Sequence, residues 1–174
     1  MENTKVQVLE KVDIKTIACF VGLMAVAIVL PRFIHNQFVT GPIVNATLFL
    51  GAYYLGSGPA ILVGLVPSVT ALSAGLLPLP LAPMVPFIMI SNAILIASFN
   101  WLKKFNFGSA TIVASLAKYL FLYVTASFVI SKLMPQTLAS KASLIMMAWP
   151  QIVTALVGGL IAFGIIKLVG LREE

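Results

Sequence analysis

Charged residues are scarce in this sequence, which has five acidic and eleven basic side chains among 174 residues, or 9% of the chain. Soluble domains carry about 25% charged residues, because their surfaces must be hydrated. Hydrophobic residues make up 60% of the chain. This composition argues against a soluble enzyme or a nucleic-acid-binding module. It favours a single integral membrane domain, residues 1–174, in contact with a lipid bilayer.

Acidic residues are absent from every apolar stretch, because all five lie in the terminal tails: Glu2, Glu10, Asp13, Glu173 and Glu174. The chain has one histidine and one cysteine, Cys19, which cannot form an intrachain disulfide. Proton-coupled carriers and membrane metalloproteases use intramembrane acids or histidine clusters. A phosphate-binding loop of the G-x-x-x-x-G-K-[ST] type is also missing. We therefore expect no metal, no cofactor and no ATPase activity in the chain itself.

Six continuously apolar stretches predict an all-α integral membrane protein, folded as a compact bundle of six transmembrane helices. The predicted spans are about 15–34, 42–54, 58–74, 83–101, 108–134 and 142–168. Residues 1–13 form a polar cytoplasmic N-terminal segment. The Gly41-Pro42 pair is expected to fix a turn before the second span. The proline-rich connection 76–86 lacks the polarity of a solvated loop, so we expect it to pack into the protein or to lie at the membrane interface.

The distribution of lysine and arginine predicts the orientation, because positive residues favour the cytoplasmic side of a membrane protein. With both termini cytoplasmic, the seven inner residues are Lys5, Lys11, Lys15, Lys103, Lys104, Lys167 and Arg172. The three outer residues are Arg32, Lys132 and Lys141. We therefore expect both termini on the cytoplasmic side.

Lys118 lies about 15 Å into the fifth predicted span, near the centre of the bilayer. A cation at that depth costs at least about 2.5 kcal/mol, so it should face a cavity or polar partners rather than lipid. Asn92 and Gln151 lie at about the same depth in their own spans, and Thr154 shares a helix face with Gln151. These residues predict a polar pocket, although hydrogen bonding between helices explains each amide equally well. Because no acid neutralises Lys118, we expect an anionic ligand or a strong hydrogen-bond acceptor.

Small residues at four-residue spacing let helix backbones approach closely. They occur at Gly56, Ala60, Gly64 and Ser68, at Ala18 and Gly22, and at Ala155 and Gly159. Most such stripes serve packing within a bundle, and some mark contact with a partner subunit.

Three segments resemble the S components of energy-coupling factor (ECF) transporters: QFVTGPIVN at 37–45, GLVPS at 64–68 and LAPMVPF at 81–87. The resemblance implies a subunit that captures a small water-soluble vitamin or related micronutrient at the outer face of a prokaryotic cell membrane. Such subunits join a membrane T component and two ATPase subunits. Small residues on their first helix contact the T component, which suggests that role for Ala18 and Gly22. The family usually has two alanines there, so Gly22 is a departure.

The predicted substrate-binding residues are Gln37, Asn45, Asn92, Lys118, Tyr123, Trp149 and Gln151. In this interpretation Lys118 supplies charge, the amides direct hydrogen bonds and the aromatic rings form a stacking wall, while Gln37 and Asn45 cap the pocket. Two other functions stay open. One is a structural or assembly subunit of a membrane complex without a solute. The other is a small membrane hydrolase in which Lys118 activates Ser115, one helical turn away.

Overall fold

The computed structural model describes residues 13–133 and 147–170, and this part of the chain is helical without any strand. Its α-helices are α1 Ile14–Phe33, α2 Gln37–Tyr54, α3 Ser57–Ser73, α4 Val85–Leu102, α5 Phe107–Leu133 and α7 Trp149–Gly170, and a 3-10 helix, η1, spans Leu79–Met84. The all-helical class expected from the sequence is confirmed for these residues. Residues 1–12 and the first part of the sixth predicted span, 142–146, lie outside the described residues.

Four helical segments are long and apolar enough to cross a membrane. They are Ile14–Phe33, Leu79–Leu102, Phe107–Ile130 and Trp149–Gly170. The two remaining helices, α2 and α3, have 18 and 17 residues and lie within the bundle, where many of their residues are buried. At about 1.5 Å per residue these helices are about 27 and 25 Å long, slightly less than the hydrocarbon core of a bilayer.

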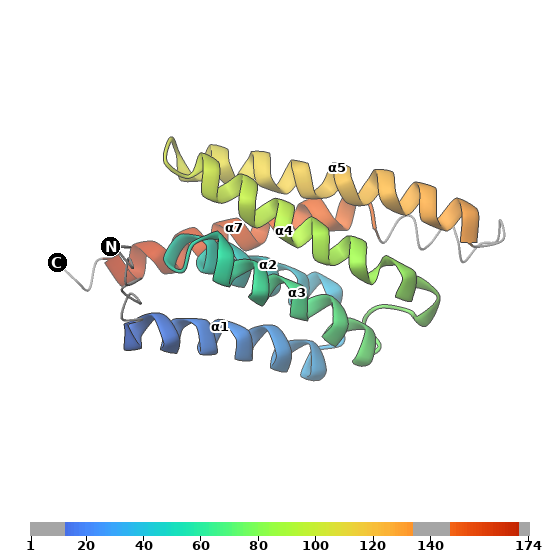
Figure 1. The fold of residues 1–174 in the computed structure, drawn as a ribbon, viewed down its shortest axis with the longest axis horizontal. Helices are drawn as coiled ribbons and strands as arrows, with labels where there is room; N and C mark the ends of the chain where they lie inside the picture. Colours follow the sequence, from blue (N-terminus) through green and yellow to red (C-terminus); the bar gives the residue numbers. More distant parts are fainter. Residues whose placement is uncertain (1–12, 134–146, 171–174) are drawn as a thin grey trace, which may run out of the picture.

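The helices run side by side along the long axis of the molecule (Figure 1). Helices α4 and α5 pack against each other, as do α2 and α7, and α1 lies at the edge of the bundle against α2 and α3. Only Ala27 and Pro31 of α1 are buried. The first residues of α1 and the last residues of α7 lie at the same end of the bundle, where Lys15 and Val169 line a shared hollow.

The predicted turn at Gly41-Pro42 is wrong, because both residues lie inside α2. The helix begins earlier than expected because the Asn36 side chain caps it, accepting a hydrogen bond from the Phe38 backbone N–H at 2.9 Å. Pro42 is the sixth residue of α2 and has no N–H to donate to the Phe38 carbonyl one turn earlier, so the helix continues through it with one backbone hydrogen bond fewer. The connection between α1 and α2 is therefore only residues 34–36.

The proline-rich connection between α3 and α4 does pack into the protein. Its side chains Leu77, Leu81 and Met84 are buried, and η1 carries two of them. With Leu122, Ala126, Ile130 and Met147 they form one apolar cluster, which we call the η1 cluster. It closes the end of the bundle away from the termini.

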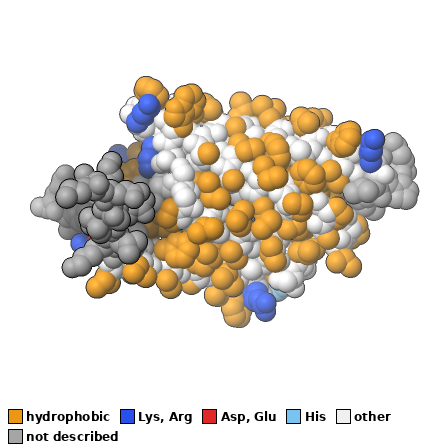
Figure 2. Space-filling model, viewed as in Figure 1, with side chains coloured by type: hydrophobic (Ala, Val, Ile, Leu, Met, Phe, Trp, Pro, Cys, Tyr) orange, Lys and Arg blue, Asp and Glu red, His pale blue; other side chains and the backbone are white. Residues whose placement is uncertain are grey.

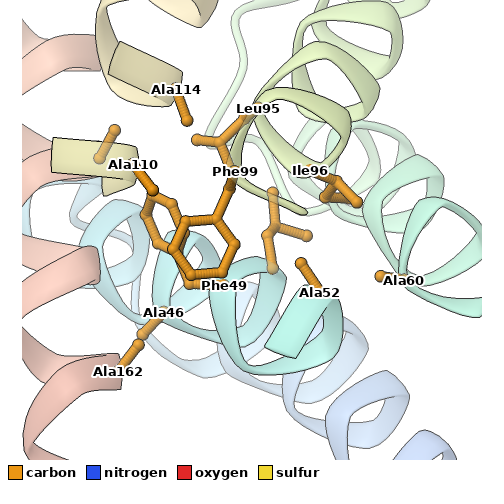
Figure 3. Close-up of a cluster of buried hydrophobic side chains, with 12 residues drawn as sticks. Ala46, Phe49, Ala52, Ala60, Leu95, Ile96, Phe99, Ala110, Ala114 and Ala162 are labelled. Carbon is orange, nitrogen blue, oxygen red and sulfur yellow. The ribbon is translucent and has the colours of Figure 1, made fainter. Parts of the chain in front are cut away.

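A second apolar cluster fills the other half of the bundle and is built from two phenylalanine rings among alanines (Figure 3). The rings of Phe49 and Phe99 meet edge to face with centroids 5.0 Å apart, a favourable aromatic geometry. Alanines from α2, α3, α5 and α7 surround them, including Ala60, Ala110 and Ala162. We call this set the phenylalanine cluster. Small residues on the neighbouring helices leave the space that the two rings occupy.

Helices α2 and α7 approach each other most closely at glycines. A Cβ atom on Gly158 would lie 2.6 Å from the Asn45 Cβ and 2.7 Å from the Pro42 carbonyl oxygen. A Cβ on Gly41 would lie 2.8 Å from the Thr154 Cγ2. The stripe Ala60, Gly64 and Ser68 on α3 is likewise buried. These small residues serve packing within the bundle, as the sequence suggested for most of them.

The surface of the bundle is mainly apolar. Figure 2 shows hydrophobic side chains across the middle of one face and the visible lysines and arginines at its margins. The two tryptophans are exposed toward opposite ends of the bundle, Trp101 near the end of α4 and Trp149 at the start of α7.

Lys103, which follows the end of α4, caps the end of α2. Its Nζ donates to the Ala52 carbonyl oxygen at 2.7 Å, which satisfies one of the last carbonyls of α2.

The close contact at Gly158 gives a stability prediction. Gly158→Ala should destabilise the protein by about 1–3 kcal/mol, because the added methyl group meets backbone atoms of α2 that cannot move away freely. Gly164→Ala is the matched control, since that glycine is on the same helix and a Cβ added there would have nothing within 4 Å. Thermal unfolding in detergent should show a lower Tm for Gly158→Ala and an equal or higher Tm for Gly164→Ala. Equal Tm values for the two variants would contradict the tight α2–α7 contact.

Candidate functional site

A cavity of about 110 Å³ lies between the helices, and Lys118 is one of its lining residues. Most of the surface that its wall exposes to the cavity is apolar. The apolar side chains are Pro31, Val44, Pro67, Ala71, Leu76, Leu77, Ile88 and Met147. The polar side chains are Gln37, Thr40, Asn45, Ser68, Asn92, Lys118, Gln151 and Thr154. Lys118 is the one charged side chain that the described part of the chain contributes to the lining of this cavity.

The floor of the cavity is a buried lysine held by two asparagines. Lys118 Nζ donates to Asn45 Oδ1 at 2.7 Å and to Asn92 Oδ1 at 2.8 Å. All three residues are at most 3% exposed. Short, charge-assisted hydrogen bonds of this kind are roughly twice as strong as neutral ones. They offset part of the cost of burying an ammonium group without an acid beside it.

The two asparagines present their oxygens to Lys118 because their amino groups are bound elsewhere. Asn92 Nδ2 donates to the Gly64 carbonyl oxygen of α3 at 2.7 Å. Asn45 Nδ2 donates to the Gly41 carbonyl oxygen at 2.9 Å, within α2, and to Thr154 Oγ1 of α7 at 3.4 Å. One hydrogen-bonded network, the lysine network, therefore links α2, α3, α4, α5 and α7.

The lysine network lies between the two apolar clusters. On α5, Lys118 is one turn after Ala114 of the phenylalanine cluster and one turn before Leu122 of the η1 cluster. On α4, Asn92 stands between Ile88, which packs on the η1 cluster, and Ile96 of the phenylalanine cluster. Polar groups thus occur where the dense packing of the bundle is interrupted.

The opposite end of the cavity, which we call its rim, is formed by partly exposed residues. Gln37 is the first residue of α2, Gln151 is the third residue of α7, and Leu76 precedes η1. Asn45 is eight residues further along α2 than Gln37, which corresponds to about 12 Å of helix rise. The cavity therefore runs from the end of the bundle away from the termini toward its middle.

The structure brings together five of the seven predicted binding residues, namely Gln37, Asn45, Asn92, Lys118 and Gln151. Gln151 lies at the rim rather than at the depth of Lys118, because α7 begins at Trp149 and not at residue 142. Tyr123 and Trp149 do not line the cavity. Tyr123 is 49% exposed and stacks on Tyr119, whereas Trp149 is 54% exposed and contacts Phe38. The described lining residues include no aromatic ring, and the apolar part of the wall consists of aliphatic side chains and prolines.

Other lining residues were not among the predicted site residues, although the spacing on α2 contained a signal for some of them. Gln37, Thr40, Gly41, Val44 and Asn45 follow the three- and four-residue spacing of a single helix face. The expected turn at Gly41-Pro42 hid this pattern. Pro67, Ser68 and Ala71 of α3 repeat it beside the cavity.

Ser115 and Lys118 do not form the hydrogen-bonded pair that a serine–lysine hydrolase requires. The Ser115 side chain is fully buried, and its Oγ has no hydrogen-bond partner within the described part of the chain. Lys118 Nζ donates to the two asparagines instead. This geometry does not support the hydrolase alternative.

Ala18 and Gly22, the predicted contacts with a partner subunit, lie on the exposed side of α1. A Cβ added to Gly22 would have nothing within 4 Å. The two residues are therefore remote from the cavity and accessible to another helix.

The fold and the cavity together define a class of protein, an apolar helical bundle suited to a membrane with a cationic pocket between its helices. No protein-family model, curated protein or solved structure matches the chain.

The lysine network gives a second stability prediction. Asn92→Leu should cost about 2–3 kcal/mol, because it removes one acceptor from a buried ammonium and leaves the Gly64 carbonyl without its side-chain donor. Asn100→Leu is the matched control, since Asn100 is two turns further along α4 and bonds a neutral hydroxyl, Ser57 Oγ, at 2.7 Å. Loss of this neutral hydrogen bond should lower the free energy of unfolding by about 1 kcal/mol or less. The measurement is the Tm of each purified variant, and a larger fall for Asn100→Leu would refute this ranking.

Proposed function

We propose that this protein is the substrate-binding membrane subunit, or S component, of an ATP-driven ECF-type importer for a small water-soluble vitamin or related micronutrient. The observation that carries the proposal is the cavity with Lys118 at its floor. Burying a cation among apolar helices is expensive, and such residues usually serve ligand or ion binding. A cavity near one end of the bundle, with polar groups at floor and rim, is suited to capturing a solute from one side of the membrane.

The proposal includes six membrane spans with both termini in the cytoplasm, in the cell membrane. The described basic residues support this orientation. Lys15, Lys103, Lys104 and Lys167 belong to the end of the bundle where α1 begins and α7 ends, and Arg32 and Lys132 belong to the other end. Positive residues favour the cytoplasmic side. The rim of the cavity then faces the outside of the cell, where a solute would be captured.

Partner subunits supply the energy in this proposal. The sequence has no phosphate-binding loop. In the proposal a T component and two ATPase subunits hydrolyse the ATP that drives transport. The exposed side of α1, with Ala18 and Gly22, is the surface we assign to the T component, because small residues there allow close helix contact.

The orientation can be tested by cysteine labelling in a Cys19→Ala background. His35→Cys, in the exposed connection between α1 and α2, should react with a membrane-impermeant thiol reagent in intact cells. Phe105→Cys, which replaces a side chain 73% exposed between α4 and α5, should react only after lysis. The reverse labelling pattern would overturn the orientation and the outward-facing rim.

The function itself can be tested by identifying what the protein retains. After gentle purification, mass spectrometry of the denatured protein should reveal a small solute in a near-stoichiometric amount. The same protein in liposomes should bind this solute but not accumulate it, unless the T component, ATPases and ATP are added. Absence of any retained solute would favour a structural or assembly subunit. Accumulation against a gradient by the isolated protein would contradict the need for ATPase partners.

A further inference from the structure

We infer that the cavity takes a small monoacid, a molecule with one carboxylate directed at Lys118 and a compact, mainly apolar body. This inference rests on the proposed function, which assigns a solute to the cavity, and it names the chemical class of that solute. Four features of the cavity support it: the number of available hydrogen-bond donors, the state of the hydroxyl groups, the charge, and the size and polarity of the wall.

The floor offers two uncommitted N–H donors, one on Lys118 and one on Asn92. An ammonium group has three N–H donors, and Lys118 uses two of them for Asn45 Oδ1 and Asn92 Oδ1. Each asparagine amino group has two N–H donors. Asn45 uses both, for the Gly41 carbonyl oxygen and Thr154 Oγ1, whereas Asn92 uses one, for the Gly64 carbonyl oxygen. The remaining N–H groups of Lys118 and Asn92 can therefore bind one acceptor group of a ligand, such as the two oxygens of a carboxylate. A ligand with more acceptor groups at this end would find too few donors for them.

The hydroxyl groups of the wall are committed to backbone carbonyls. Thr40 Oγ1 donates to the Asn36 carbonyl oxygen at 2.9 Å, Ser68 Oγ to that of Leu65 at 3.1 Å, and Thr154 Oγ1 to that of Gln151 at 3.2 Å. A sugar-like ligand needs several donors and acceptors along its length, because each buried hydroxyl group without a partner is costly. The cavity is poorly suited to a polyhydroxylated solute.

The charge of the site matches one negative charge. Among the described residues that line the cavity, 13–133 and 147–170, Lys118 is the single charged one. A carboxylate would neutralise it, and the pair would then carry no net charge within the apolar bundle. A phosphate monoester carries about −1.5 to −2 charges and three oxygens that need donors. It would leave excess negative charge, and one phosphate oxygen without a donor, in a site that has two free N–H groups at its floor.

The size and wall of the cavity limit the body of the ligand. A cavity of about 150 Å³ in another protein holds benzene, and the cavity here measures about 110 Å³. A short branched chain or a single ring that reaches toward the rim fits these dimensions. Val44, Ile88 and Met147 offer such a body apolar contacts rather than hydrogen bonds.

The test is a binding panel measured by isothermal titration calorimetry on the intact protein in lipid nanodiscs, with empty nanodiscs as the blank. Isobutyrate and benzoate are the monoacid probes, isobutyramide and benzamide their neutral counterparts, and phenyl phosphate the probe of higher charge. Each acid should bind at least about tenfold more tightly than its amide, since a charge-assisted hydrogen bond replaces a neutral one. Phenyl phosphate should bind more weakly than benzoate.

Two variants link this preference to the lysine network. Lys118→Gln keeps amide donors at the floor but removes the charge, so acid and amide should bind about equally. Asn45→Asp provides an internal counter-ion for Lys118 and should likewise abolish the preference for the acid. Lys103→Gln is the matched control, because Lys103 bonds backbone carbonyls at the far end of α2 and does not line the cavity. The Lys103→Gln variant should prefer each acid over its amide by the same factor as the parent protein. The Tm of each variant reports whether it is folded, and Asn45→Asp still tests the inference if Lys118→Gln does not fold.

Amide binding equal to acid binding in the parent, or tighter binding of phenyl phosphate, would overturn the monoacid inference. The inference would also be overturned if every folded variant among Lys118→Gln and Asn45→Asp still preferred the acid over the amide. Failure of every probe to bind at millimolar concentration would overturn it as well. The proposed function is judged separately by the solute that the purified protein retains. A retained solute that is neutral or multiply charged would leave the proposed function standing and refute the monoacid inference. Absence of both a retained solute and probe binding would refute both.

Discussion

The arrangement of this bundle depends on one interaction, the pair of hydrogen bonds from the buried Lys118 ammonium to the oxygens of Asn45 and Asn92. Burying a cation without a counter-ion costs several kcal/mol in proteins, and two charge-assisted hydrogen bonds offset part of that cost. For those bonds to form, α2, α4 and α5 must meet at one level. The backbone carbonyls of Gly41 and Gly64 also have to hold the asparagine amino groups away from the lysine. The charge therefore constrains several helices at once.

The surrounding packing explains why a cavity persists beside this network. The phenylalanine cluster fills one half of the bundle, where alanines on four helices leave room for two large rings. The η1 cluster fills the other end with leucine, isoleucine and methionine side chains. Between them, glycines such as Gly158 draw α2 against α7, while prolines of α1 and α3 line the cavity. A proline lacks the backbone N–H that completes a helical turn. The two helices that contain these prolines, α1 and α3, border the cavity, where the packing is interrupted.

Much of the fold was predictable because long apolar stretches bounded by turn residues leave few alternatives to membrane-type helices. The convergence of Lys118 and Asn92 was also predictable, since a polar group at that depth requires a partner. The positions of Tyr123 and Trp149 were not. Tyr123 is on α5 and Trp149 is on α7. Neither helix has a clear polar side and apolar side in its sequence, so the sequence does not fix how each helix is rotated about its axis. The start of α2 was missed for a different reason. The Asn36 cap acts through its side chain, and Gly41-Pro42 gave a stronger local signal for a turn.

The contact between α2 and α7 also determines when the cavity can exist. Asn45 and Thr154 are 109 residues apart in sequence, yet they share a hydrogen bond. Helices generally insert into a membrane first and associate afterwards. A ribosome delivers α1 through α5 before α7, and until then Gly41 lacks its contact with Thr154 and the Asn45 amino group lacks one of its acceptors, although Lys118 of α5 can already bond Asn45 Oδ1. The cavity wall is thus completed by the last described helix to be synthesised. A nascent chain that stops short of α7 would leave the cavity without the wall that Gln151 and Thr154 supply.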